Sequence, residues 1–269
     1  MTIATVDDAI LGIQPFEYFH KVLSPATVIA RPYTPFYLAG IPGPAVAPSP
    51  GVAGAALTSY AGQIPFPAAV GGETIHLAGF SGGSSAQSGT LLLCDRLWHN
   101  SGLSITLNTS QTVNSVTFPA RDDDGSTNGA GVYIGLEVST GMGVGTPTLS
   151  IGYTNSAGTA GRSANNIQLV VASSAIGTFY QFGLQAGDVG VRSIQTYQQT
   201  ATMTSGVHHL VAYRILAMVE MINAAVVEQL TLLTSAMPRV YDNTVPFLIF
   251  IPNTTAATSI FGSAVFTQR

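Results

Sequence analysis

The sequence has 269 residues, a formal net charge of −4 and only 8% charged residues, whereas an ordinary soluble protein has about 25%. Hydrophobic residues make up 46%, but the longest apolar region, Val207 to Met237, is interrupted by Arg214, Glu220 and Glu228, so we expect no membrane-spanning helix. The single lysine, Lys21, and the scattered arginines lack the clustering that phosphate backbones require, which argues against nucleic-acid binding.

The cysteine content and the first residues of the chain indicate the cellular compartment in which it is made. Cys94 is the only cysteine, so no internal disulfide can form. The segment from Met1 to Asp8 contains two acids and no basic region followed by an apolar block, so it does not resemble a secretory signal. We therefore expect synthesis in a cytoplasm. Because a weakly charged, apolar surface promotes aggregation, we also expect other protein subunits to cover it.

The first part of the chain, residues 1–72, is expected to form an N-terminal segment and an extended arm. From Asp7 to Val22 the pattern is loosely helical, with Ile10, Ile13 and Phe16 spaced by three, and a short helix there remains one of two readings. From Pro25 to Gly72 the chain is rich in proline, which disfavours helix and removes backbone donors. The arm's apolar side chains require cover, either from its own subunit or from a neighbour.

Residues 73–269 carry the signals of an antiparallel sheet. Apolar and small polar residues alternate in three segments, Leu103–Leu107, Val132–Val138 and Leu149–Tyr153, so each has one face for a core. Around Asn114 the alternation changes phase, as at a β-bulge. Further strands are expected at Thr74–Ala78, Leu91–Trp98, Ile167–Ala172, Phe179–Leu184, Val191–Gln195, Val207–Glu220, Val245–Ile251 and Ile260–Phe266. The fold class is therefore all-β, an antiparallel β-sandwich with at most one or two short helices.

Two segments leave more than one structural interpretation open, and other segments predict turns. Residues 215–235 fit both a helical and a strand period. The strand at 245–251 is apolar on both faces, which indicates a sheet covered on both sides or an interface. Turns are expected at Arg121–Gly129, Ser139–Pro147 and Asn155–Asn166, because they are rich in Gly, Ser and Asn.

Two motifs resemble functional sites but lack part of the surrounding sequence pattern that such sites have. Gly79, Ser81 and Gly83 match the Gly-x-Ser-x-Gly nucleophile elbow, but no helical period follows and no α/β alternation surrounds it, so a flexible loop is the better interpretation. Asp122 and Asp124 lie in an acidic loop with oxygen ligands at alternate positions, as calcium sites have. The loop lacks the EF-hand spacing, which leaves a looser site with these two weak candidates or a plain acidic turn.

The five histidines lack the spaced companions of a zinc site, and His208 and His209 are adjacent, so on a strand they point to opposite faces. No phosphate-binding loop ends in Lys followed by Ser or Thr. The sequence therefore predicts no enzyme, no catalytic residue and no cofactor.

The middle and end of the chain resemble virion structural proteins of tailed bacteriophages, of the capsid decoration, cement or other accessory head type. The runs that carry the resemblance are Leu91–Trp98, Tyr153–Arg162, Leu184–Arg192 and His209–Arg214. The resemblance implies a jelly-roll-like β-sandwich that works by assembly in a virion. Its partners would be copies of itself and the major capsid protein or other virion proteins, with no nucleic acid or membrane.

Two functions are compatible with these observations. The first is a non-enzymatic shell component that stabilises a capsid through subunit contacts, for which the candidate interface residues are Phe36, Tyr37, Ile41, Tyr60, Phe66, Phe247, Ile249 and Ile251. The second is a carbohydrate-binding or host-recognition module of a tail or spike, in which Trp98, Tyr133 and Tyr153 would contact sugars.

Overall fold

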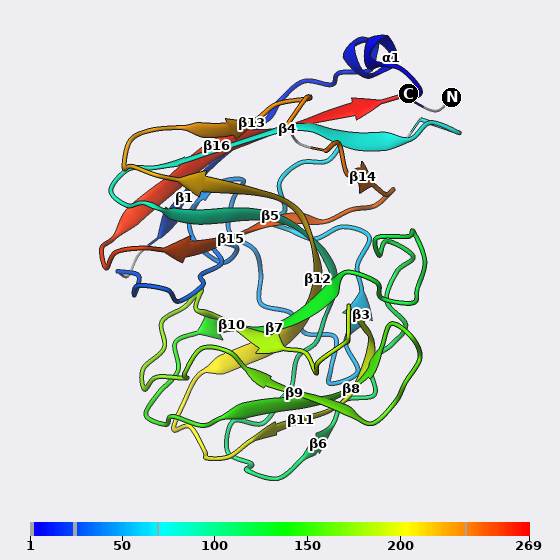
Figure 1. Ribbon diagram of the computed structural model, residues 1–269. Coiled ribbons are helices and arrows are strands. Elements are labelled where there is room, and N and C mark those ends of the chain that lie inside the picture. The colour runs from blue at the N-terminus through cyan, green and yellow to red at the C-terminus, as the bar shows by residue number, and fades with distance from the viewer. Residues whose placement is uncertain (1–2, 24–25, 69, 235) are drawn as a thin grey trace.

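The computed structural model describes residues 3–23, 26–68, 70–234 and 236–269. Two antiparallel sheets pack together as a sandwich, and the larger sheet curls into a half-barrel in the lower part of Figure 1. Within the described residues there is one helix, α1 (Val6–Leu11). The prediction of an all-β antiparallel sandwich with at most one or two short helices is confirmed. No helix in these ranges is long and apolar enough to cross a membrane.

The smaller sheet brings the two ends of the chain together. Its strand order is β13-β4-β16-β1-β2, with β14 also paired to β4. β1 pairs along its whole length with β16, antiparallel, from Glu17 opposite Ala264 to Leu23 opposite Thr258. The strands are β1 (Glu17–Leu23), β2 (Gly40–Ile41), β4 (Ile75–Ser84), β13 (Glu228–Leu230), β14 (Arg239–Val240) and β16 (Thr258–Gln268).

The larger sheet has the order β15-β5-β12-β7-β10-β9-β8-β11-β6, with β3 paired to β5. β12 is long enough to serve both halves of the molecule, and Figure 1 shows it arching from the sandwich into the half-barrel. The strands are β3 (Ala55–Ala56), β5 (Gly89–His99), β6 (Gln111–Thr112), β7 (Val132–Thr140), β8 (Leu149–Asn155), β9 (Arg162–Asn166), β10 (Phe179–Gly183), β11 (Val191–Gln199), β12 (Val207–Met221) and β15 (Pro246–Pro252).

Three hydrophobic clusters follow from this arrangement. One fills the half-barrel and includes Trp98 and Tyr153. A second lies between the two sheets and includes Phe80 and Phe250. A third lies where arm residues cover β5, β12 and β15, and includes Phe247. Since Phe247 and Phe250 belong to different clusters, β15 is apolar on both faces because the fold covers it on both sides.

The N-terminal segment is part of the sandwich. α1 begins with a capping box in which the Thr5 side chain accepts from the Asp8 amide and the Asp8 carboxylate accepts from the Thr5 amide. The helical reading is wrong beyond residue 11, because residues 17–23 alternate buried and exposed side chains as strand β1. Asp7 and Asp8 lie in the first helical turn, where acidic side chains are favourable.

The proline-rich arm packs on its own subunit. Tyr33 and Phe250 exchange both backbone hydrogen bonds, each at 2.8 Å, so the arm pairs with the outer edge of β15. The Ile64 amide donates to the Pro246 carbonyl at 3.0 Å. These contacts cover an edge strand that would otherwise present unpaired backbone groups. Of the residues assigned to the arm, Pro25 and Ala69 lie outside the described residues, as does Ser235 of the ambiguous 215–235 region.

Two strand predictions are wrong, and one predicted irregularity is real. Leu103–Leu107 is not a strand, because the Gln111 side chain bonds both backbone groups of Ser104 and so takes the place of a ladder partner. Residues 167–172 are irregular, and the strand β9 lies instead in the polar stretch just before them. The phase change at Asn114 is a real irregularity, since the Val113 and Asn114 amides both donate to the Gln195 carbonyl.

The glycine-rich segment 79–83 is a strand, not the flexible loop that its composition suggests. It lies in β4, paired with β13 on one side and β16 on the other. A Cβ at Gly82 would stand 2.6 Å from the Leu91 side chain, so glycine permits the two sheets to approach closely there. Ser81 bonds Ser263 across the sheet at 3.0 Å and has no adjacent base, which fits no nucleophile elbow.

Candidate functional site

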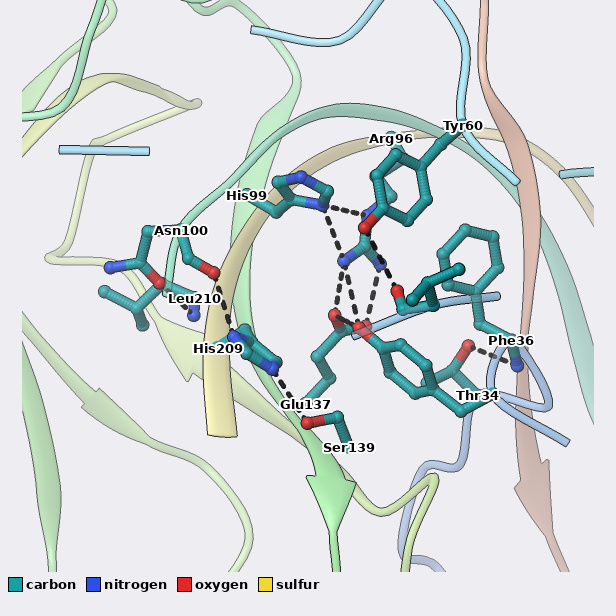
Figure 2. A network of polar contacts seen from close by, with 12 residues as sticks. Thr34, Phe36, Tyr60, Arg96, His99, Asn100, Glu137, Ser139, His209 and Leu210 are labelled. Carbon is teal, nitrogen blue, oxygen red and sulfur yellow. Dashed lines mark hydrogen bonds and ion pairs between the residues drawn. The ribbon is translucent and has the colours of Figure 1, made fainter. Parts of the chain in front are cut away.

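The most polar part of the interior lies beneath the arm, and Figure 2 shows it. Arg96 of β5 and Glu137 of β7 form an ion pair in which both side chains are 0% exposed. Arg96 Nη1 donates to one Glu137 carboxylate oxygen at 2.7 Å, and Nη2 donates to the other. The guanidinium carbon lies 4.7 Å from the ring centre of Phe36 and 5.6 Å from that of Phe247. The charge is therefore held between two aromatic rings.

Tyr37 of the arm completes the pair. Its hydroxyl donates to Glu137, and the Arg96 Nη2 lies 3.4 Å from the same hydroxyl oxygen. Burial and the negative charge of Glu137 raise the pKa of Tyr37 well above its usual value. The tyrosine therefore stays protonated and acts as a neutral donor that ties the arm to the sheet.

His99 lies at the other end of the guanidinium. Its Nδ1 accepts from Arg96 Nε at 3.3 Å and lies 3.2 Å from Arg96 Nη2. Arginine can only donate, so the ring proton of neutral His99 is on Nε2. Burial first, and then the positive charge of Arg96, lower the pKa of His99 to about 2. The Tyr60 ring packs edge-on against the imidazole, with 4.6 Å between ring centres.

His209 and Ser139 have the spacing of a nucleophile and its base. Ser139 Oγ lies 2.8 Å from His209 Nε2, while His209 Nδ1 donates to the Asn100 carbonyl at 2.9 Å. The pair is inaccessible, because His209 is 1% exposed and Ser139 is 8% exposed. A substrate carbonyl cannot reach the hydroxyl, so the arrangement is structural.

A second buried pair starts from the preceding residue of β5. Asp95 accepts from Arg121 Nε at 2.9 Å and from Nη2 at 3.1 Å. Asp95 also accepts from the Val245 amide at 3.0 Å, and Arg121 Nη1 donates to the Leu57 carbonyl at 2.7 Å. Adjacent residues of a strand face opposite sides, so the two pairs stabilise different faces of the sheet.

The candidate interface residues are mostly internal, which corrects the expectation that they line the surface. Four are buried and belong to the cluster beneath the arm, because the arm folds over its own sheet: Phe36, Tyr37, Phe247 and Ile249. Tyr60, Phe66 and Ile251 are half-buried against the chain's own clusters. Ile41 is 56% exposed and is the one of the eight that is mainly accessible.

The acidic loop is an amide-binding turn. Asp122 Oδ1 accepts from the amides of Asp124 and Ser126, and Oδ2 accepts from the Ser126 hydroxyl and the amides of Gly129 and Ala130. These donors lower the pKa of Asp122 against the opposing effect of burial. The carboxylate is saturated with N–H and O–H donors, while Asp124 is exposed. Across the described ranges no three His, Cys, Asp or Glu side chains are grouped to hold a metal ion.

The aromatic residues considered for sugar binding differ in their exposure to solvent. Trp98 and Tyr153 are completely buried in the half-barrel cluster. Tyr133 is partly exposed and lines a surface hollow together with Ile167 and Ile215. Two of the three rings therefore have no face available for a ligand.

Sequence reasoning missed an exposed apolar region at the end of the molecule that carries α1. Here α1 and the segment after β13 line a common hollow, formed by Ile3, Ala4, Thr5, Val6, Ala9, Leu232, Leu233 and Met237. Leu11 is 73% exposed and Leu233 is 84% exposed. We call the exposed side chains of this region the apolar rim: Val6, Ile10, Leu11, Ile13, Phe16 and Leu233. The spacing of Ile10, Ile13 and Phe16 was the available signal, but a helix six residues long buries only Ala9.

Comparisons with known proteins add little. No protein-family model matches the sequence, and no curated protein matches it. Among solved structures, the VP2 subviral particle of infectious bursal disease virus aligns with 95% of this chain and 81% of that chain, at 9% identity and a TM-score of 0.19. A structure of the Gt strain of the same virus covers 95% and 82%, at 9% identity and a TM-score of 0.17. Likeness this weak carries no argument about function.

Proposed function

We propose that the protein is a non-enzymatic structural subunit that works by association with copies of itself, as a decoration, cement or other accessory protein of a tailed-bacteriophage virion. The observation that carries the proposal is the apolar rim, where large side chains such as Leu11 and Leu233 stay in water in the single chain. Monomeric proteins keep contiguous apolar surface small, and larger patches are typical of contact sites.

Composition supports the same proposal. With 8% charged residues, the chain has few groups to keep an apolar surface dispersed. The buried Arg96–Glu137 and Asp95–Arg121 pairs use four of these groups internally. The arm stabilises its own subunit, so the rim is the more suitable contact surface. The virion location and the major capsid protein as a partner come from the sequence resemblance alone.

Self-association of the purified chain tests the proposal. We expect sedimentation velocity to show concentration-dependent oligomers, and the triple variant Ile10→Ser, Leu11→Ser, Leu233→Ser to remain monomeric because the rim loses its apolar side chains. A matched control is Ile167→Ser with Leu169→Ser, since these residues are 63% and 83% exposed in a different part of the molecule. A wild-type chain that stays monomeric at high concentration, or a control that dissociates equally, would contradict the proposal.

The carbohydrate-binding alternative gains no supporting observation. Trp98 and Tyr153 are core residues, and Tyr133 remains as a single exposed ring. One half-exposed tyrosine is ordinary for a protein surface.

A further inference from the structure

A short turn of the arm, Thr58–Gln63, closes over His99, and we call it the Tyr60 flap. It is bounded by two backbone anchors: the Leu57 amide donates to the Leu97 carbonyl at 2.9 Å, and the Ile64 amide donates to the Pro246 carbonyl at 3.0 Å. Inside the flap the backbone bonds are local, since the Gln63 amide donates to Tyr60 and the Tyr60 amide donates to the Gln63 side chain. The flap can therefore move between its anchors without breaking a backbone bond to either sheet, and the Tyr60 and Gln63 amides report the movement because their bonds form only in the closed turn.

Tyr60 is the side chain that holds the flap shut. Its ring meets His99 edge-on at 4.6 Å and stacks on Phe36 at 6.1 Å between centres. Its hydroxyl donates to the Val46 carbonyl at 3.0 Å, near the surface. The closed position thus depends on the contact between Tyr60 and the His99 imidazole, which is only 2% exposed.

His99 has no place for a second ring proton while the flap is closed. A proton added to Nδ1 would point at Arg96 Nε and Nη2, which lie 3.3 and 3.2 Å away and are themselves donors. The nearest anion cannot compensate, because the Glu137 oxygens already accept from Arg96 and Tyr37. Protonation must turn the ring away from Arg96, and Tyr60 occupies the space beside the imidazole.

We propose that the Tyr60 flap is an acid-opened device: it covers His99 when the imidazole is neutral and swings away between its anchors when His99 takes up a proton. Opening would admit water to the Arg96–Glu137 junction while both sheets remain folded.

The other titratable groups that face His99 do not act as the trigger. Arg96 from β5 and Glu137 from β7 are paired with each other, and Tyr37 and Tyr60 from the arm have pKa values raised by burial. His209 from β12 can adapt to a proton on Nε2, because the Ser139 hydroxyl can rotate and donate to the Val207 carbonyl at 3.4 Å. His99 has no such movable partner.

The direction of the pH effect follows from the pKa of His99, which burial lowers to about 2 in the closed state from its usual value of about 6.5. A group whose pKa is lower in the closed state stabilises that state fully above the open-state pKa and progressively less below it. Opening takes up one proton, so the opening equilibrium constant should rise about tenfold per pH unit as pH falls below 6.5.

Amide hydrogen exchange of the full chain, measured from pH 7.5 to pH 4, tests this proposal. The rates are expressed as protection factors, which removes the pH dependence of intrinsic amide exchange. We expect protection of the Tyr60 and Gln63 amides to fall about tenfold per pH unit below pH 6.5, while the anchoring Leu57 and Ile64 amides, β5 and β12 stay protected and the far-ultraviolet circular dichroism is constant. His99→Gln keeps an acceptor for Arg96 and has no titratable ring, so its flap should lose the pH dependence. His20→Gln, at an exposed histidine of β1, should keep it.

The proposal would be overturned if protection of the Tyr60 and Gln63 amides stayed constant with pH until the whole protein unfolds. The same pH dependence in His99→Gln would also overturn it. If that variant does not fold, the His99 ring can be titrated in the wild-type chain by nuclear magnetic resonance. Its midpoint must then coincide with the loss of flap protection, and two separate midpoints would refute the mechanism.

Discussion

The two ion pairs that start from neighbouring residues of β5 differ in what surrounds them. Asp95–Arg121 is enclosed mainly by backbone: its atoms also bond the Val245 amide and the carbonyls of Leu57 and Arg96, and a single side chain, the Thr244 hydroxyl, donates to Asp95 at 3.3 Å. Arg96–Glu137 is enclosed by side chains, namely Tyr37, His99 and two phenylalanine rings. Both pairs are buried, but only the second has a titratable neutral partner.

This difference indicates two kinds of stabilisation within one strand. A charge whose remaining hydrogen bonds go to backbone atoms is tied to the fold itself and changes little unless the fold opens. A charge whose remaining bonds go to side chains depends on their rotamers and protonation states. We therefore expect the junction around Arg96 to respond to acid through His99, and to respond more strongly to single substitutions than Asp95–Arg121 does.

Removing the carboxylate of Glu137 should have the largest effect. Glu137→Gln leaves Arg96 charged in an enclosed site with no counter-ion, and breaking a buried pair in this way typically costs about 3–5 kcal/mol. Urea unfolding at pH 7.5 measures the loss. The control is Asp123→Asn, because that carboxylate is 58% exposed and 3.8 Å from Arg214, and such a pair contributes about 1 kcal/mol at most. A loss in Glu137→Gln no greater than that of the control would show that Arg96 does not need its counter-ion.

Removing the carboxylate of Asp95, in the other ion pair, should lower the unfolding free energy by less. Asp95→Asn retains one carbonyl acceptor, and Arg121 still donates to the carbonyls of Leu57 and Arg96. The loss is then that of hydrogen bonds to a charged group, about 1.5–3 kcal/mol. The same unfolding experiment measures it, and the ratio of the two losses tests the comparison. If Asp95→Asn proves the more damaging, backbone enclosure does not protect a pair in the way argued above.

Neither pair could be predicted from the sequence. Arg96 and Glu137 lie 41 positions apart and Asp95 and Arg121 lie 26 apart, and no local pattern links them. Alternation did identify the strands at Val132 and Leu149, because one face of each packs in a core. The pairing of β1 with β16 across almost the whole chain follows from tertiary packing, which a period cannot reveal.

The failures have local physical causes. At Leu103–Leu107 the Gln111 side chain satisfies backbone groups that a strand would have paired. In β4 the glycines indicated a loop, but sheet packing at Gly82 requires the absence of a side chain. The candidate interface side chains Phe36 and Phe247 were identified correctly as needing cover, yet the sequence could not show that their own subunit provides it. The apolar rim was missed because it depends on which helix face the fold leaves uncovered.

The smallest expected effect concerns His208, which lies on the opposite face of β12 from His209 and has no arginine beside it. Both of its ring nitrogens are buried without a hydrogen-bond partner, and burial lowers its pKa to about 3. His208→Leu removes two unsatisfied polar atoms, so we expect a gain of about 1 kcal/mol in unfolding free energy at pH 7.5. Because the folded-state pKa lies below the unfolded value, wild-type stability falls as pH drops from 6.5 towards 3.

The advantage of His208→Leu should therefore grow by about 1.4 kcal/mol per pH unit below 6.5. Urea unfolding at pH 7.5, 6 and 5 measures it, with His20→Leu as the control, since His20 is exposed on β1. A variant that is less stable than wild type at pH 7.5 would show that His208 has a polar partner in solution, such as a buried water. A polar partner would also stabilise the charged ring, so the advantage of His208→Leu would then grow less steeply as the pH falls.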